Sequence, residues 1–204
     1  MGNDLITMST VDELREDLRK TLQPYPDVIT RVRRVYFDRP SFALADKHEV
    51  EFEIKHLVAD RYNIPFRSVV FTGSAQLGFS PQKDTEFKRG NSDLDIACID
   101  ARLFQWVWQS VITATKAFTD LSGFNDYRHA ERLQDQLLRR SMILFDYLPR
   151  SRDRMEEQRF VDGLSQRFRT HFGRVSIAVY MSEWAFCWKQ QSALGTILGY
   201  ENAK

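Results

Sequence analysis

The chain has 204 residues, of which 43% are apolar and 28% are charged. This length and apolar content suffice for one good hydrophobic core, so we expect a single domain over residues 1–204. A formal net charge of +1 gives no global field that would mark a binder of nucleic acid or of membrane surfaces. Two cysteines, Cys98 and Cys187, exclude a disulfide framework and have no metal-ligand spacing.

No apolar run approaches the roughly 20 residues that span a bilayer, and the first twenty residues are too acidic and polar for a signal peptide. We therefore expect a cytoplasmic protein without a membrane partner. The charges are unevenly distributed, since residues 128–174 carry eleven arginines, no lysine and seven acids. This stretch is either a solvated helical surface or a face for phosphates or an acidic acceptor.

The N-terminal part, residues 1–45, is predicted to be helical. Thr10 and Glu13 have the spacing of a capping box, and apolar residues follow at helical intervals over residues 11–22. A second short helix is predicted over residues 28–38, where an Asp-Arg-Pro sequence breaks the pattern.

Residues 46–100 are predicted to form a helix followed by two strands. Residues 46–49 repeat the capping-box spacing, and an apolar stripe continues to about residue 62. Val69 to Phe71 is a β-branched and aromatic run that stops at Gly73 and Ser74, which predicts a buried strand ending in a tight turn. Gly73 lets the backbone approach a ligand, and Ser74 has donors for phosphate oxygens.

The second strand, residues 92–99, carries two acids. Asp93 and Asp95 share one face of an extended chain, about 6 to 7 Å apart at the usual rise of roughly 3.3 Å per residue. Two adjacent carboxylates repel each other, and a hard cation between them would remove that repulsion. Mg²⁺ is usually held by one or two carboxylates together with phosphate oxygens, so this pair is a candidate metal site.

Between the two strands the sequence is polar. Residues 77–80 are expected to start a short helix, and residues 81–90 are expected to be a mobile loop that carries Lys83, Lys88 and Arg89. The loop is either plainly solvated or closes on a triphosphate, whose charge these cations would neutralise.

Residues 102–172 are predicted to be a mainly helical part. Helices are expected over residues 103–118, 128–141 and 155–172, with a less regular apolar piece over residues 142–149. Gly173 is expected to end the last helix. Residues 174–181 alternate as a third core strand, with residues 175, 177, 179 and 181 on one side, and residues 184–188 are either a further strand or a helix opening.

Gly73-Ser74 followed by Asp93-Leu94-Asp95 resembles the motif of the DNA polymerase β-type nucleotidyltransferase superfamily. The likeness is specific from Phe71 to Ile99, although the 18 residues between Ser74 and Asp93 exceed the usual family gap. It implies an α/β (α+β) fold with a small mixed β-sheet flanked by several helices. The catalytic core would comprise residues 46–100 and 174–182.

The resemblance also implies a reaction: transfer of a nucleoside monophosphate from an NTP, such as ATP, or a dNTP to a hydroxyl acceptor, with release of pyrophosphate. The implied cofactor is Mg²⁺ or Mn²⁺, bound by the catalytic residues Asp93 and Asp95. The candidate nucleotide-binding residues are Gly73 and Ser74 of the motif, together with Lys83, Lys88 and Arg89 of the polar loop.

The chain departs from the family at the third carboxylate, which the family places on the later strand. That strand has no acid here: Ser176 lies on its polar side, and Glu183 lies just past its end. Three interpretations remain open. The site is completed by Glu183 or by water, it holds one metal firmly, or the enzyme has lapsed and still binds nucleotide.

The acceptor is also open. The short chain leaves little room for the helical domain of larger members, so the resemblance favours a compact bacterial type. Such members include toxin–antitoxin proteins that nucleotidylate a partner protein, and antiphage-defence enzymes that make a nucleotide or oligonucleotide signal. The run from Gly73 to Ser80 resembles the latter, as in Hailong-like systems. The competing hypothesis is a non-catalytic module that binds nucleotide or an effector or partner protein.

Overall fold

The computed structural model describes residues 10–199. Within that range there are eight α-helices: α1 (Val11–Leu22), α2 (Val28–Val32), α3 (His48–Tyr62), α4 (Gly73–Leu77), α5 (Ala101–Thr115), α6 (Tyr127–Arg140), α7 (Arg152–Arg167) and α8 (Glu183–Leu198). Four further helical segments are a π-helix and three 3₁₀ turns: η1 (Arg33–Asp38), η2 (Phe42–Leu44), η3 (Phe66–Ser68) and η4 (Phe145–Tyr147). None of the helices in this part of the chain is long and apolar enough to cross a membrane.

The strands form one mixed sheet and one small hairpin, which confirms the predicted α/β class. They are β1 (Val69–Thr72), β2 (Phe79–Ser80), β3 (Thr85–Glu86), β4 (Leu94–Ile99), β5 (Met142–Leu144) and β6 (Val175–Tyr180). The sheet has the order β1-β4-β6-β5, in which only β4 and β6 are parallel, and β2 pairs with β3. The third core strand predicted after Gly173 is therefore present, at the centre of the sheet.

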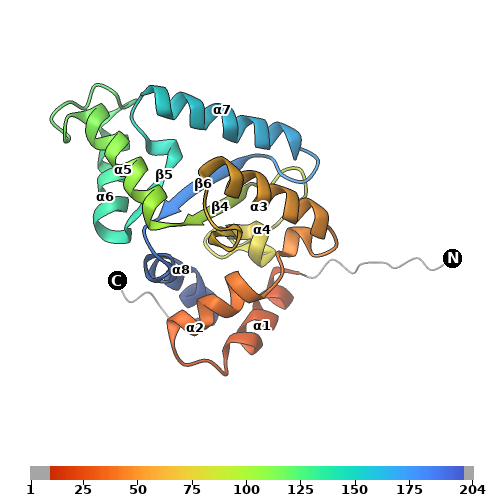
Figure 1. The fold of residues 1–204 in the computed structure, drawn as a ribbon. Coiled ribbons are helices and arrows are strands. Elements are labelled where there is room, and N and C mark those ends of the chain that lie inside the picture. Colours follow the sequence, from red (N-terminus) through yellow and green to blue (C-terminus); the bar gives the residue numbers. More distant parts are fainter. Residues whose placement is uncertain (1–9, 200–204) are drawn as a thin grey trace.

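One face of the sheet carries the larger core. Helices α3, α5 and α7 cover this face (Figure 1), and the side chains that point toward them alternate along each strand. The central strands contribute the buried residues Ile96, Cys98, Val175, Ile177 and Val179. The alternation predicted for β6 is thus correct for Val175, Ile177 and Val179, whereas Met181 lies beyond the strand and is exposed.

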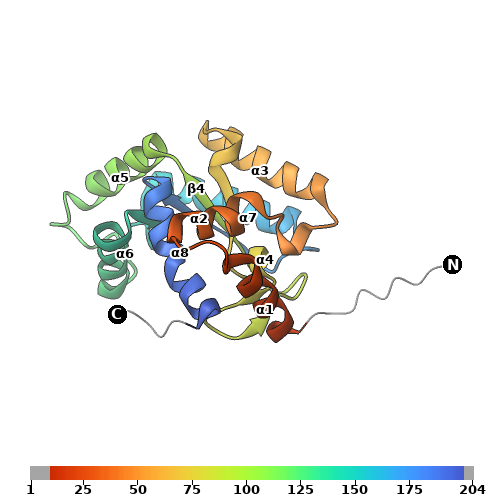
Figure 2. The ribbon, with the colours of Figure 1, turned by 90° about the horizontal axis from the view of Figure 1, so that it is seen from below.

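The opposite face packs against α1, α2, η1 and α8, which lie in front of the sheet when it is seen from below (Figure 2). Its core includes Val70, Ala97 and Tyr180 from the strands, with Phe186 from α8. Small and polar residues take the places of large apolar ones at one end of this face. The hollow described below lies there.

Of the two capping boxes predicted in the first fifty residues, one forms and the other does not. The Thr10 hydroxyl accepts from the Glu13 backbone N–H while the Glu13 carboxylate accepts from the Thr10 N–H, so the predicted capping box forms. The second predicted box, at residues 46–49, does not form. Helix α3 begins at His48 without a side-chain cap, because Asp46 instead pairs with Lys47 and Arg89.

Other boundaries also differ from the prediction. Helix formation starts directly at Gly73, so residues 77–80 end a helix and enter β2, and the expected loop over residues 81–90 contains β3. The apolar piece after residue 141 begins with strand β5, which is too short to show an alternating pattern. The segment at residues 184–188 is the start of helix α8.

The last predicted boundary was wrong for a packing reason. Helix α7 ends at Arg167, well before Gly173. Gly173 instead lies against the loop that precedes β4, where a Cβ atom would come within 2.4 Å of the Asn91 carbonyl oxygen. Close approach of two backbones, and not helix termination, requires glycine at this position.

Buried Gln76 joins α4 to η1 and to the residue that follows it. Its side-chain amide donates to the carbonyl oxygens of Val35, at 2.7 Å, and Arg39, at 3.1 Å. We predict that Gln76→Met, which keeps the length but removes both donors, lowers the free energy of unfolding by about 2 kcal/mol, because two carbonyls lose their partner. Urea unfolding measures this loss. The control Gln158→Met, at an exposed site on α7, should lower the free energy of unfolding by only a few tenths of that amount. Equal losses would contradict this role.

Candidate active site

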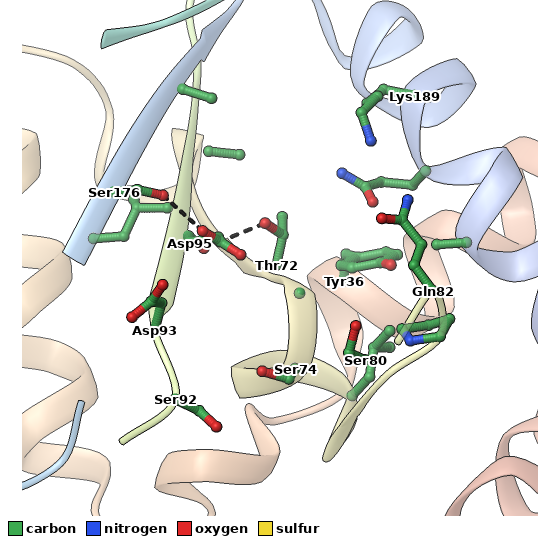
Figure 3. Close-up of a pocket in the computed structure, with 18 of the residues that line it drawn as sticks. Tyr36, Thr72, Ser74, Ser80, Gln82, Ser92, Asp93, Asp95, Ser176 and Lys189 are labelled. Carbon is green, nitrogen blue, oxygen red and sulfur yellow. Dashed lines mark hydrogen bonds between the residues drawn. The ribbon is translucent and has the colours of Figure 1, made fainter. Parts of the chain in front are cut away.

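A row of three polar residues crosses the sheet at the end of β1. The strand register places Thr72 opposite Asp95 and Asp95 opposite Ser176. The Ser176 hydroxyl donates to Asp95 Oδ1 at 2.6 Å, and the Thr72 hydroxyl donates to the Asp95 carbonyl oxygen at 3.3 Å (Figure 3). The predicted register of Ser176, beside the acidic strand and facing the candidate site, is therefore correct.

The next row of the same face is built from small residues. Ala97 on β4 and Ala178 on β6 are paired partners, and their short side chains leave a hollow in front of the sheet. The resulting cavity has a volume of about 530 Å³. Tyr36, Gln82 and Lys189 form the wall that faces the strands (Figure 3).

Asp93 enters this cavity from the loop before β4. Backbone hydrogen bonds hold that loop to the segment before β6: Gly90 N–H donates to the His171 carbonyl at 2.9 Å, and Gly173 N–H donates to the Ser92 carbonyl at 2.9 Å. Asp93 therefore precedes β4 by one residue and still lines the same cavity as Asp95. The two carboxylates line one cavity, although only Asp95 belongs to the strand over which a shared face was predicted.

The electrostatics of Asp95 are those of a carboxylate with too few compensating groups. Burial raises the pKa of Asp95, because protein atoms surround the side chain on the sides that do not open to the cavity. The hydrogen bond from Ser176 works in the opposite direction, while the negative charges of Asp93 and Asp146 raise the pKa further. Asp146 follows β5, and Arg174 binds it at 2.5 Å.

Gly73 has a stricter role than phosphate access alone. Its φ angle is +64°, and a Cβ atom would lie 2.5 Å from Asp95 Oδ2. Glycine is therefore required both by the left-handed backbone and by the carboxylate beside it. Ser74, the next residue, lines the cavity together with Lys83 from the turn of the hairpin.

Other predicted residues lie elsewhere. Lys88 and Arg89 do not line this cavity, and Arg89 is 3.4 Å from Asp46. Glu183 also lies outside it: its carboxylate binds Arg33 at 2.6 Å and lines a separate hollow between η1 and α8. Glu183 as the third acid is therefore not supported by the structure, because its position at the start of α8 directs it to Arg33. Within residues 10–199 no three His, Cys, Asp or Glu side chains form a metal-binding group.

Lys189 is the residue that sequence reasoning missed. It projects from α8 into the cavity (Figure 3), and the burial of its side chain together with the charge of Arg140 lowers its pKa, while Asp95 raises it. No motif surrounds it. Its neighbours on the helix, Phe186 and Gln190, are buried. Only the packing of α8 onto the sheet identifies it.

The donor set fits a hard divalent cation held in part by a substrate. Asp93 and Asp95 supply carboxylate oxygens, and neither forms an ion pair with another residue of the described range. Mg²⁺ prefers oxygen ligands and usually completes its shell with water and substrate phosphates, so two carboxylates suffice where a nucleotide brings the rest. An all-protein metal cage does not fit these residues.

We predict that Gly73→Ala destabilises the protein more than Gly199→Ala does. Both positions have a left-handed backbone, which costs an L-residue about 1–2 kcal/mol, but only Gly73 also has a carboxylate at 2.5 Å from the new methyl group. Urea unfolding measures the difference. In the double variant Gly73→Ala/Asp95→Ala the extra loss should shrink, since the overlapping oxygen is gone. Identical losses at the two glycines would contradict the close contact.

Comparison with protein-family models, with curated proteins and with solved structures gives no match for this chain.

Proposed function

We propose that this chain is a metal-dependent nucleotidyltransferase, which moves a nucleoside monophosphate from an NTP or dNTP to a hydroxyl acceptor. One observation carries the proposal. Gly73, Ser74, Asp93 and Asp95, which are separate in the sequence, line a single cavity together with Lys189. A glycine turn for phosphates and an acid pair for a hard cation are the two parts that such a reaction requires.

The residues divide between the cation and the phosphates. Asp93 and Asp95 would hold Mg²⁺ or Mn²⁺ from the sheet side of the cavity. The bound cation supplies Lewis-acid stabilisation of charge on the phosphate oxygens. Ser74 would donate to the β- and γ-phosphates, and Lys83 and Lys189 would neutralise their charge from two different walls.

In the reaction, an acceptor oxygen forms a bond to the α-phosphorus while the bond from that phosphorus to the bridging oxygen breaks. Pyrophosphate leaves with the electron pair, and the acceptor proton passes to solvent. The chain need supply no nucleophile of its own. Among the described residues that line the cavity there is no histidine or cysteine, so none of its serine or threonine hydroxyls has a histidine base there.

Ser176 occupies the place at which the resemblance leads us to expect a third acid. Its hydrogen bond orients Asp95 and lowers the pKa that burial raises. We infer a metal site with only two protein carboxylates, which holds one cation firmly. We also assign the protein to the cytoplasm, where nucleoside triphosphates are available and where two buried thiols, Cys98 and Cys187, stay reduced.

A second candidate function is a catalytically lapsed module that binds nucleotide or a partner protein. The lack of a third acid beside Asp93 and Asp95 favours it. The acid pair, whose two charges repel each other unless a metal ion binds between them, favours the enzyme. For the enzyme, the resemblance suggests two classes of acceptor. One is a nucleotide or oligonucleotide, as in signal synthesis for antiphage defence, and the other is a partner protein.

We predict that Asp93→Asn and Asp95→Asn each reduce Mg²⁺-dependent pyrophosphate release from NTPs at least a hundredfold while the fold persists. The amide keeps the shape of the side chain but removes the charge that holds the cation. The matched control is Glu183→Gln, which removes an acid outside the cavity and should retain activity. Wild-type turnover in either aspartate variant would place the chemistry elsewhere.

We predict that Ser176→Asp and Ser176→Asn differ in a charge-specific way. In the wild type the Ser176 hydroxyl is 2.6 Å from Asp95 Oδ1, so a carboxylate at position 176 would lie beside Asp95. The melting temperature of the metal-free Ser176→Asp variant should therefore fall, because a third negative charge joins those of Asp93 and Asp95. Mg²⁺ affinity in the presence of nucleotide should rise at least several-fold. Ser176→Asn has nearly the same shape without the charge and should do neither. Calorimetric titration and thermal unfolding measure both effects, and equal behaviour of the two variants would contradict the assignment.

A further inference from the structure

A second hollow lies next to the candidate active site, on the outer side of α8. It has a volume of about 480 Å³ and joins α8 to the end of α6. We call it the tryptophan shelf and define it by Arg139, Arg140, Trp184 and Trp188. Lys189 lines both this hollow and the candidate active-site cavity, so the two lie on either side of one side chain.

The two tryptophans of the shelf are exposed side by side. Trp184 and Trp188 are 61% and 53% exposed, and they follow each other by one turn of α8. Their ring centroids are 5.4 Å apart with planes tilted by 58°. On the same helix Phe186 packs into the core, whereas the two indole rings are not part of it. Paired exposed rings are a platform on which successive unpaired bases stack.

Basic residues line the shelf together with the two rings. Arg139 is largely exposed and binds Asp135 on its own helix at 2.9 Å. Arg140 forms no ion pair with the carboxylates of residues 10–199, and its charge lowers the pKa of Lys189. Glu183, the acid nearest in sequence to the tryptophans, is engaged by Arg33. A ligand that combines aromatic rings with negative charges matches this arrangement.

We propose that the tryptophan shelf binds the single-stranded nucleic acid that serves as the acceptor, with bases stacked on Trp184 and Trp188 and phosphates near Arg140. The strand would run past Lys189, so that its terminal hydroxyl enters the catalytic cavity. This inference rests on the proposed function, since it names the acceptor class of the same site. Double-stranded nucleic acid does not fit, because its bases are already stacked.

The test is direct binding of labelled single-stranded oligonucleotides of two to twelve residues, measured by fluorescence anisotropy without metal or NTP. Trp184→Ala and Trp188→Ala should each weaken binding about tenfold, and the Phe variants should recover part of it. Arg140→Ala should reduce the salt slope by about 0.7, the value for one phosphate contact in a single strand. Trp106→Ala, which removes a 46% exposed tryptophan of α5, is the matched control and should bind like the wild type.

Any of four outcomes would overturn the proposal that the shelf binds single strands. Both Trp→Ala variants could bind the oligonucleotide with wild-type affinity, or the protein could bind duplex as tightly as single strands. A mononucleotide could bind as tightly as the oligomers, or the enzyme could transfer the nucleotide to protein only. The assay also separates the two proposals. Pyrophosphate release without oligonucleotide binding removes the shelf alone, whereas binding at the shelf without metal-dependent turnover removes the enzymatic function and leaves a nucleic-acid-binding surface.

Discussion

The candidate site depends on two negative charges that the backbone holds in one hollow. Asp95 is part of a central strand that pairs on both sides, and Asp93 is the residue before that strand, in a loop whose Ser92 and Leu94 bond to the segment before β6. Their mutual repulsion acts against the folded state, and partial desolvation of Asp95, whose side chain still opens to the cavity, also raises its pKa. The rest of the fold must offset this cost. The two helical layers do so with apolar cores on both faces of the sheet.

The hollow itself results from small side chains in the second row of the sheet. With Ala97 and Ala178 behind the acids, α8 covers the sheet without filling the space, and Lys189 extends into it. Ser176 then has a double effect, because its hydroxyl fixes the orientation of Asp95 while leaving the third position uncharged. A site of this composition relies on its ligand for the remaining cation contacts.

The extent to which the sequence predicts this arrangement follows from the range of each interaction. The capping box at Thr10 and the alternation of β6 involve neighbouring residues, so they were correct. The register of Ser176 followed from strand alternation alone. Glu183 remained one of the open candidates for the third acid because its partner Arg33 is 150 residues away in sequence. Lys189 and the role of Gly173 were missed for the same reason, since only the packing of distant segments reveals them.

The place of β6 in the sheet has a consequence for how the chain is made. β6 lies between β4 and β5 and supplies Ser176, although it is the last strand in the sequence. Until it is synthesised, β4 has an open edge that carries Leu94, Ile96 and Cys98, and open apolar edges pair readily with other chains. Long-range parallel pairing is also slow to form. We therefore expect the emerging polypeptide to be most prone to aggregation while the segment between β4 and β6 leaves the ribosome.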